Sequence, residues 1–403
     1  MHTIMIVLHA MHQHLSRQAT RLRFFIAESL VLAIAGALVF AAPVLSTTTP
    51  CELPAAAGEV TSLSAGRAGS VWLAVATASA AGGKSRYRTA LYRTSAPGRQ
   101  WKKVLEVPGR RSVGRLWFFG PSGIVAWLAG GPAFGGTAQN TIMRTEDGGV
   151  RWHAVSLPRT NRAGVGTFIN PVEGWAVQTE VGAGTASSIL YHTLDGGNQW
   201  TELGVLPDER SPSGPSTGLM TGIEFRDTAH GWVGTNFFGT MLPIFYMTDD
   251  GGVTWKQQGL SAPAGGPDHW TTGEVSPPRF FKDGAGIAVA LLSNGKNGVK
   301  PFAYQSSNGG RTWGKPRPFP VKPGPTDSLA WDVLSPTAWA VAENQTLWLS
   351  SDAGRTWSVH PIPLPQPYQI VRIALFAPKQ VWVVAAHWGA PWQLPNAACV
   401  LLT

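Results

Sequence analysis

Short apolar stretches recur along the chain from residue 58 to the carboxyl terminus, and polar, Gly-rich or Pro-rich segments separate them. One type of stretch is a short run of apolar residues that usually contains a Trp. It occurs seven times, at residues 71–75, 126–128, 174–177, 231–233, 286–289, 338–341 and 381–384. A second apolar stretch precedes each of these, and two more follow before the next copy. This pattern predicts four short strands per repeat of roughly 50 residues.

A polar motif recurs with the same period at a different phase. It reads Ser/Thr-x-Asp-Gly-Gly-x-x-Trp, with small variations, at residues 145–152, 193–200, 248–255, 306–313 and 350–357, and a degenerate copy occupies residues 94–101. Successive Trp residues are 44 to 58 positions apart.

The motif predicts a tight turn between the third and fourth strands. Its acid or amide can accept backbone N–H groups, and its Gly pair supplies positive φ angles. Its Trp covers an apolar layer. The residues with these structural roles are Asp147, Asp195, Asp250, Asn308, Asp352, Trp101, Trp152, Trp200, Trp255, Trp313 and Trp357.

Together the two periodic elements predict an all-β fold. Four strands per unit and seven units predict a seven-bladed β-propeller of four-stranded blades that occupies residues 58–403. The seventh unit ends at Thr403, where its turn motif should begin. We therefore expect a strand near residues 48–54 to pair with the carboxyl-terminal strand and close the ring.

That pairing would bring the two Cys residues of the chain onto adjacent strands. Cys51 and Cys399 are the only Cys in the sequence, and the segments around them are the two that the closure pairs. A disulfide between them is one prediction for an exported chain. Two unpaired buried thiols are the alternative.

The amino-terminal part predicts export. Residues 24–45 form a 22-residue stretch whose only charge is Glu28, and Arg17, Arg21 and Arg23 precede it. This length suffices to span a bilayer, and the positive flank keeps residues 1–23 in the cytoplasm. Residues 24–45 are therefore a cleaved signal peptide or a retained transmembrane anchor, and residues 46–57 are a linker with the closing strand. The protein is expected outside the cytoplasm, anchored or secreted.

Composition excludes several classes of function. The formal net charge of +9 is spread over 403 residues without a long basic run, so we expect no nucleic-acid partner. Two Cys exclude a four-Cys zinc site, and no motif indicates a metal or any other cofactor.

The turn motif resembles the Asp-box (BNR) repeat, and we call it the Asp-box below. With the Gly-Trp-Ala-Val strand before it, the pattern looks most like propellers of the photosystem II stability/assembly-factor type, from about residue 58 to residue 403. This resemblance implies a seven-bladed, extracytoplasmic, non-enzymatic protein that grips partner proteins. Sialidases and some endo-glucanases also carry Asp-boxes, so a glycoside hydrolase is the alternative; no sialidase-like Arg-Ile-Pro motif is present.

Any propeller site would lie on the innermost strands and at one mouth of the channel. The charged residues expected there are Arg115, Glu224, Arg226, Glu274, Asp332 and Arg372, with His269 and Trp270 nearby. In the enzyme alternative, Glu274 and Asp332 would be the acid and the nucleophile or base. In the preferred interpretation these charges line a binding face for a protein or another ligand, and the chain acts as a monomer.

Overall fold

In a computed structural model, the chain divides into two compact units, Met1–Ser46 and Thr47–Thr403. The structure describes residues 48–51, 58–66, 70–81, 84–94, 100–109, 111–120, 122–130, 141–158, 163–182, 185–206, 219–236, 243–264, 270–293, 298–324, 329–364, 366–387 and 396–402. The predicted signal or anchor segment lies outside these residues. Within them, no helix has the length and apolar character that crossing a bilayer requires.

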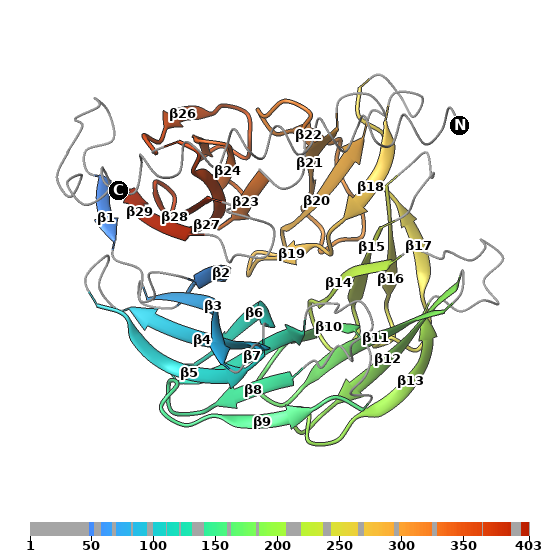
Figure 1. The fold of residues 1–403 in the computed structure, drawn as a ribbon. Coiled ribbons are helices and arrows are strands. Elements are labelled where there is room, and N and C mark those ends of the chain that lie inside the picture. Colours follow the sequence, from blue (N-terminus) through green and yellow to red (C-terminus); the bar gives the residue numbers. More distant parts are fainter. Residues whose placement is uncertain are drawn as a thin grey trace, which may run out of the picture. The chain divides into compact units, whose positions relative to one another are not determined.

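The regular elements of the described residues are strands, which confirms the all-β prediction (Figure 1). They form seven consecutive groups, here called sheets 1 to 7. Sheet 1 contains β2 (Gly58–Ala65), β3 (Val71–Ala81), β4 (Lys84–Thr94) and β5 (Lys102–Pro108). Sheet 2 contains β6 (Arg111–Phe119), β7 (Gly123–Gly130), β8 (Thr141–Thr145) and β9 (His153–Ser156). Sheet 3 contains β10 (Ala163–Phe168), β11 (Gly174–Gly182), β12 (Thr185–Thr193) and β13 (Thr201–Leu206).

The remaining groups follow the same order. Sheet 4 contains β14 (Leu219–Phe225), β15 (Gly231–Asn236), β16 (Ile244–Thr248) and β17 (Lys256–Gly259). Sheet 5 contains β18 (Thr271–Val275), β19 (Arg279–Phe280), β20 (Gly286–Ser293), β21 (Val299–Ser306) and β22 (Arg317–Pro318). Sheet 6 contains β23 (Leu329–Val333), β24 (Trp339–Glu343), β25 (Thr346–Ser350) and β26 (Ser358–Pro361). Sheet 7 contains β27 (Gln369–Ala377), β28 (Gln380–His387), β29 (Asn396–Leu402) and β1 (Thr48–Cys51).

Each sheet is an antiparallel meander, but sheet 5 departs from the predicted four strands. Its first strand is broken into β18 and β19, which both pair with β20. Pro277 and Pro278 lie at the break, and proline has no N–H to continue a ladder. A single residue pair, Thr235 of β15 with Val275 of β18, also joins sheets 4 and 5.

Sheet 7 joins the first and last described strands of the chain. β1 runs antiparallel to β29, and Thr48 pairs with Leu402. The same register pairs the Cα atoms of Cys51 and Cys399. Their side chains lie outside what the structure describes, so the disulfide stays a prediction.

The hydrophobic core lies between neighbouring sheets. Each cluster of buried side chains combines two sheets, and most clusters join sheets that follow one another in the sequence; Trp175 of sheet 3, for example, packs with Ile223 and Val233 of sheet 4. Another cluster joins Val60 of sheet 1 to Trp382 of sheet 7. The first strands of the sheets therefore face a common centre, as Figure 1 shows.

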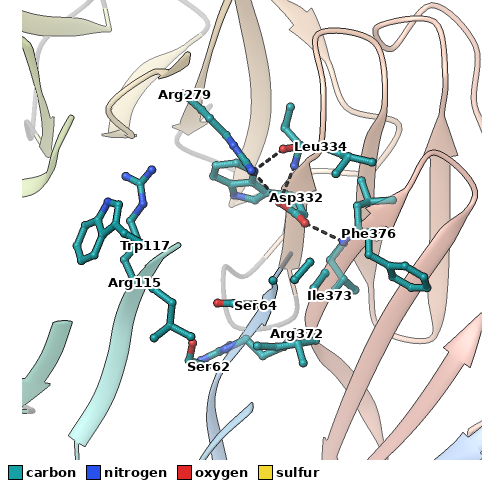
Figure 2. Close-up of a pocket in the computed structure, with 18 of the residues that line it drawn as sticks. Ser62, Ser64, Arg115, Trp117, Arg279, Asp332, Leu334, Arg372, Ile373 and Phe376 are labelled. Carbon is teal, nitrogen blue, oxygen red and sulfur yellow. Dashed lines mark hydrogen bonds and ion pairs between the residues drawn. The ribbon is translucent and has the colours of Figure 1, made fainter. Parts of the chain in front are cut away.

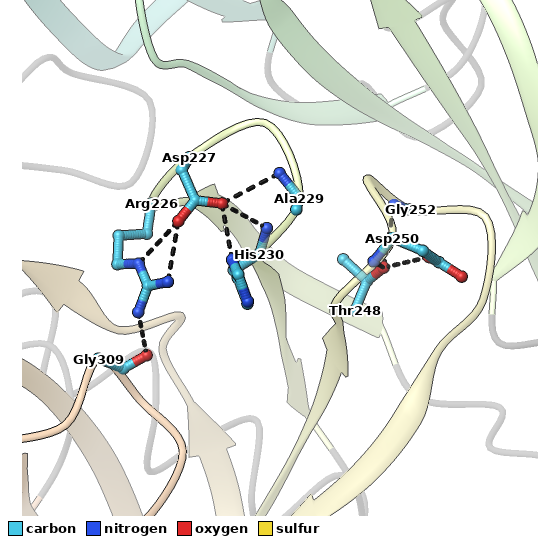
Figure 3. A network of polar contacts seen from close by, with 8 residues as sticks. All are labelled: Arg226, Asp227, Ala229, His230, Thr248, Asp250, Gly252 and Gly309. Atoms are coloured by element: carbon cyan, nitrogen blue, oxygen red, sulfur yellow. Dashed lines mark hydrogen bonds and ion pairs between the residues drawn. The ribbon is translucent and has the colours of Figure 1, made fainter.

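The Asp-boxes form one repeated hydrogen-bonded turn. In sheet 4, the Thr248 hydroxyl donates to Asp250 Oδ1 (2.7 Å) and accepts the Gly252 N–H (2.9 Å), as Figure 3 shows. Asp250 Oδ1 also accepts the Thr254 N–H at 2.8 Å. Gly251 and Gly252 have φ angles of 77° and 103°, which strongly favour glycine. The Asp-box carboxylates are thus bonded to their own turns.

The Asp-box turn lies at the same end of each sheet as the turn between strands one and two. In sheets 2 to 6, one backbone N–H of the box donates to a carbonyl of that turn; in sheet 3 this bond joins Gly196 N to Val172 O at 2.6 Å. We call this the box end. In each of these sheets, the two turns at the box end are therefore hydrogen-bonded to each other.

Arginine side chains connect one sheet to the box of the next. Arg144 of sheet 2 donates to the carbonyl oxygens of Pro171 (2.6 Å) and Gly196 (3.0 Å) in sheet 3. After sheet 4's first strand, Arg226 donates to the Gly309 carbonyl of sheet 5 at 2.6 Å (Figure 3). Arg93 and Arg317 make equivalent contacts. These bonds link neighbouring sheets at the box end.

Candidate functional site

A cavity of about 800 Å³ lies among the first strands of sheets 1, 2, 5, 6 and 7 (Figure 2). Four charged side chains line it: Arg115, Arg279, Asp332 and Arg372. Ser62 and Ser64 of β2 and the indoles of Trp117 and Trp331 complete the polar and aromatic lining. Three of the four charged side chains in the lining are therefore arginines.

Strand register places these residues in two layers. Glu224, Arg279 and Asp332 occupy equivalent positions on the first strands of sheets 4, 5 and 6. Each pairs with the second residue of the second strand in its sheet, close to the start of the Asp-box. Arg115 and Arg372 lie further from the box end, opposite Trp127 and Val384. Side chains at equivalent positions of the first strands point in equivalent directions, so the first three residues form one layer and the two arginines lie in another, further from the box end.

Arg115 is bound to an acid two sheets away. Its guanidinium forms an ion pair with Glu224 and donates from Nη2 to Oε1 at 3.1 Å. The Thr167 hydroxyl of sheet 3 donates to the same carboxylate at 3.2 Å. The Arg115 guanidinium also lies 5.4 Å from the centre of the Trp117 ring. Glu224 therefore orients Arg115, although Glu224 itself is not among the residues that line the cavity.

Asp332 holds two first strands together. Its Oδ1 accepts the Val333 N–H at 2.8 Å, and its Oδ2 accepts the Leu375 N–H of sheet 7 at 2.8 Å. Arg279 of sheet 5 approaches Oδ1 at 3.4 Å and donates to the Val333 carbonyl at 2.5 Å (Figure 2). Burial raises the pKa of Asp332, and the charge of Arg279 opposes that rise. Both oxygens are thus engaged in structural bonds.

Glu274 does not lie beside Asp332. Glu274 pairs with Leu291, which lies five positions after the first residue of β20. Asp332 pairs with the residue one position after the first residue of β24. Four positions correspond to roughly 13 Å along the strands. Burial raises the pKa of Glu274, and Glu274 is not among the cavity residues. Paired glycosidase carboxylates lie about 5–9.5 Å apart, so these two residues do not match that arrangement.

The other expected residues lie in different places. Arg226 follows the end of β14 and binds Asp227 and Gly309 away from the cavity. Trp270 packs against Phe302 in sheet 5, and His269 lies outside the described residues. Arg372 lines the cavity, where partial loss of solvent around its guanidinium lowers its pKa and the charge of Glu59 opposes that change.

Sequence reasoning did not select Arg279 or Trp117 for the site. Arg279 follows Pro277 and Pro278, which interrupt the strand pattern, so its position on a first strand was hidden. Counting back from the second strand would have placed it level with Glu224 and Asp332. Within the described part of the chain, no group of His, Cys, Asp and Glu is arranged to hold a metal ion.

Comparison with known proteins gives the fold. No protein-family model matches the chain, and no curated protein sequence matches it. A solved structure of YCF48 bound to D1 peptide matches with a TM-score of 0.51 and 18% identity, covering 91% of this chain and 99% of that one. YCF48 from Cyanidioschyzon merolae matches with a TM-score of 0.51 and 16% identity, covering 89% and 98%. The chain therefore has the same fold as YCF48, which confirms the resemblance that the Asp-box pattern suggested at the level of the fold.

The same fold also occurs in an enzyme. A polysaccharide lyase of family PL25, an ulvan lyase bound to a GlcA–Rha3S oligosaccharide, matches with a TM-score of 0.52 and 10% identity, covering 88% of this chain and 96% of that one. Because a peptide-binding protein and a lyase share the architecture, the fold alone does not select a function.

Proposed function

We propose that this protein is an exported, non-enzymatic propeller that binds a carboxylate-bearing segment of an extracytoplasmic protein in the central cavity. In this role it would resemble an assembly or stability factor for an extracytoplasmic complex. The observation that carries the proposal is the composition of the cavity lining, which contains three arginines and a single acid. Guanidinium groups bind carboxylates with charge-assisted hydrogen bonds.

The state of the acid favours binding over hydrolysis. Asp332 accepts two backbone N–H groups from different sheets, so its oxygens are already bonded. No second carboxylate is among the cavity residues that the structure describes. The binding of a D1 peptide by YCF48, which has the same fold, adds support for a peptide-like ligand.

A capture experiment tests this function. The full chain would be used to retain extracytoplasmic proteins, and the retained partner would be compared between the wild type and an Arg115→Ala/Arg372→Ala variant. Losing two charge-assisted contacts should lower partner retention by about tenfold or more. Arg88→Ala is the matched control, because Arg88 is an exposed arginine whose ion pair with Glu106 lies on the outer strands of sheet 1. Equal retention by the wild type and the double variant would contradict the proposal.

The glycoside hydrolase alternative has its own test. Fluorogenic glycosides, including sialosides, would be offered to the wild type and to Asp332→Asn and Glu274→Gln variants. We expect no turnover by any of the three. Turnover that disappears in either variant would establish the enzyme and refute the non-enzymatic function.

The proposal includes closure of the propeller by the amino-terminal strand. The pairing of β1 with β29 and the shared core of sheets 1 and 7 support it. The aligned Cα atoms of Cys51 and Cys399 support a disulfide across this closure. Both features suit a chain that folds outside the cytoplasm, where disulfides persist.

A further inference from the structure

Arg372 differs from the other two arginines of the cavity lining. Arg115 and Arg279 are each paired with a carboxylate. Arg372 forms no ion pair within the described part of the chain, and its Nη1 donates to the carbonyl oxygen of its neighbour Val371 at 2.7 Å. A guanidinium has five N–H donors, so most of those on Arg372 remain for a ligand. The charge of Glu59, which lies outside the lining, also acts on Arg372.

Two serine hydroxyls of β2 also line the cavity. Ser62 and Ser64 are half-buried, and neither hydroxyl has a hydrogen-bond partner among the residues that the structure describes. Thr61, beside them, instead donates to the Ala74 carbonyl oxygen at 3.4 Å. A serine hydroxyl can donate one hydrogen bond, so this strand presents two donors to the cavity.

Strand register brings these three side chains to the same part of the cavity. Ser62 pairs with Ala74 and Arg372 pairs with Val384, and each partner lies two residues after the Trp of its strand. Ser62 and Arg372 are therefore at the same level of sheets 1 and 7. Ser64 lies two residues nearer the box end on the same face of β2. Because β2 and β27 pack against each other, the three side chains form one group at the junction of these sheets (Figure 2).

The surroundings of Arg372 favour an anion. Partial loss of solvent around its guanidinium lowers its pKa. A charge that has lost solvent gains more from an opposite charge than a hydrated charge does. The N–H groups of a guanidinium bind the two oxygens of a carboxylate in a charge-assisted pair, and hydroxyls can donate to the remaining lone pairs. One guanidinium and two hydroxyls thus match a single carboxylate.

We propose that the carboxylate of the ligand binds at the junction of sheets 1 and 7, against the Arg372 guanidinium and the hydroxyls of Ser62 and Ser64. Arg115 and Arg279, whose charges are already paired, form the cavity wall and contribute less to the attraction. This inference rests on the proposed function and goes beyond it by assigning the carboxylate to one of the three arginines. A chain terminus and an Asp or Glu side chain both supply this group.

Chemical modification of the full chain with phenylglyoxal tests this assignment. The reagent reacts with guanidinium groups, and mass spectrometry of the digested protein would give a modification rate for each arginine of the cavity. A paired guanidinium must first leave its carboxylate before it reacts. We therefore expect Arg372 to be modified about fivefold faster than Arg115 or Arg279.

Peptide probes then test whether a carboxylate occupies the group. The first is N-acetyl-tetra-alanine with a free terminal carboxylate, the second is its amide, and the third is the amide with one Ala replaced by Glu. At about ten times its Kd, a carboxylate peptide should slow the modification of Arg372 about tenfold. The all-alanine amide should not slow it. Protection by the first or the third peptide supports the inference and identifies the source of the carboxylate.

Removing the two hydroxyls tests the contribution of β2. A Ser62→Ala/Ser64→Ala variant loses two hydrogen bonds to a charged ligand, so its affinity for the protecting peptide should fall about tenfold or more. The matched control is Ser156→Ala with Ser358→Ala, because both serines are exposed on outer strands, β9 and β26. This control should leave the affinity unchanged.

Several results would overturn the inference. Among them are modification of Arg115 or Arg279 as fast as that of Arg372, no protection by either carboxylate peptide, and equal protection by the all-alanine amide. Unchanged affinity in the double serine variant is another. Partner capture separates this failure from that of the proposed function. Retention that is lost on Arg115→Ala but kept on Arg372→Ala would refute the assignment alone, whereas a wild type that retains no partner would refute the function.

Discussion

Replacing Arg144 by Met should weaken the junction between sheets 2 and 3. The Arg144 guanidinium donates to three carbonyl oxygens of sheet 3, those of Asp195 (3.3 Å), Gly196 (3.0 Å) and Pro171 (2.6 Å). Hydrogen bonds from a charged donor contribute about 1.5–3 kcal/mol each when buried, and less where water reaches them. Met keeps the aliphatic stem, so the loss isolates these bonds. Because Arg144 is only half-buried, we expect the free energy of unfolding to fall by about 3 kcal/mol.

Calorimetry of the full chain measures this change. Unfolding a domain of roughly 350 residues carries an entropy of about 0.7 kcal/mol/K, so 3 kcal/mol corresponds to a fall of about 4 °C in Tm. Arg151→Met is the control, because this neighbouring arginine is exposed and bonds only to Asp147 in its own turn. The control should not shift Tm measurably. Equal Tm values for the wild type and Arg144→Met would refute the idea that arginines stabilise the sheet junctions.

Further outcomes are expected from other substitutions and conditions. Gly196→Ala should destabilise the fold more than Gly120→Ala. Both positions have positive φ, but only at Gly196 would an added Cβ lie 1.6 Å from the guanidinium of Arg144. Equal melting temperatures for the two variants would contradict that contact. For Asp227, burial raises the pKa but hydrogen bonds from neighbouring histidine and arginine side chains outweigh it and lower the pKa from 3.8 to about 2. Asp227 therefore stabilises the fold above its unfolded pKa, this stability is lost as the pH falls from about 4 to about 2, and Asp227→Asn should flatten that part of a pH-dependent unfolding curve. A thiol assay on the unfolded, unreduced protein should find no reactive thiol at Cys51 or Cys399, and two reactive thiols would show that the disulfide is absent.

Periodic features of the sequence were sufficient to predict the sheets. The Trp of the second strand is buried in several sheets, and Trp175, Trp232 and Trp382 are each at most 1% exposed. A buried indole that recurs at the same point of each repeat indicates the same strand in every repeat. The strand pattern of one repeat could therefore be applied to the others along the chain. Only the split of β18 from β19 departed from it, because two prolines interrupt the ladder there.

The site was less predictable because side-chain direction depends on register. Bulges shift the pairing beside Arg115, Arg372 and Glu274, so alternation along the sequence does not indicate which side each faces. Arg226 reads as a first-strand residue in the sequence. In the structure Arg226 lies one residue past the end of the strand, and its side chain donates to the Gly309 carbonyl of sheet 5. Such a side-chain contact between neighbouring repeats has no signal in a single sequence.

The partnership of β1 with β29 has a consequence for biosynthesis. Among the described strands β1 is translated first and β29 last, so sheet 7 can be completed only after residues 396–402 have been synthesised. A truncated chain that ends before residue 396 would leave β28 with an unpaired edge, which favours aggregation and proteolysis. Chains that end before β29 should therefore aggregate or be degraded before they accumulate.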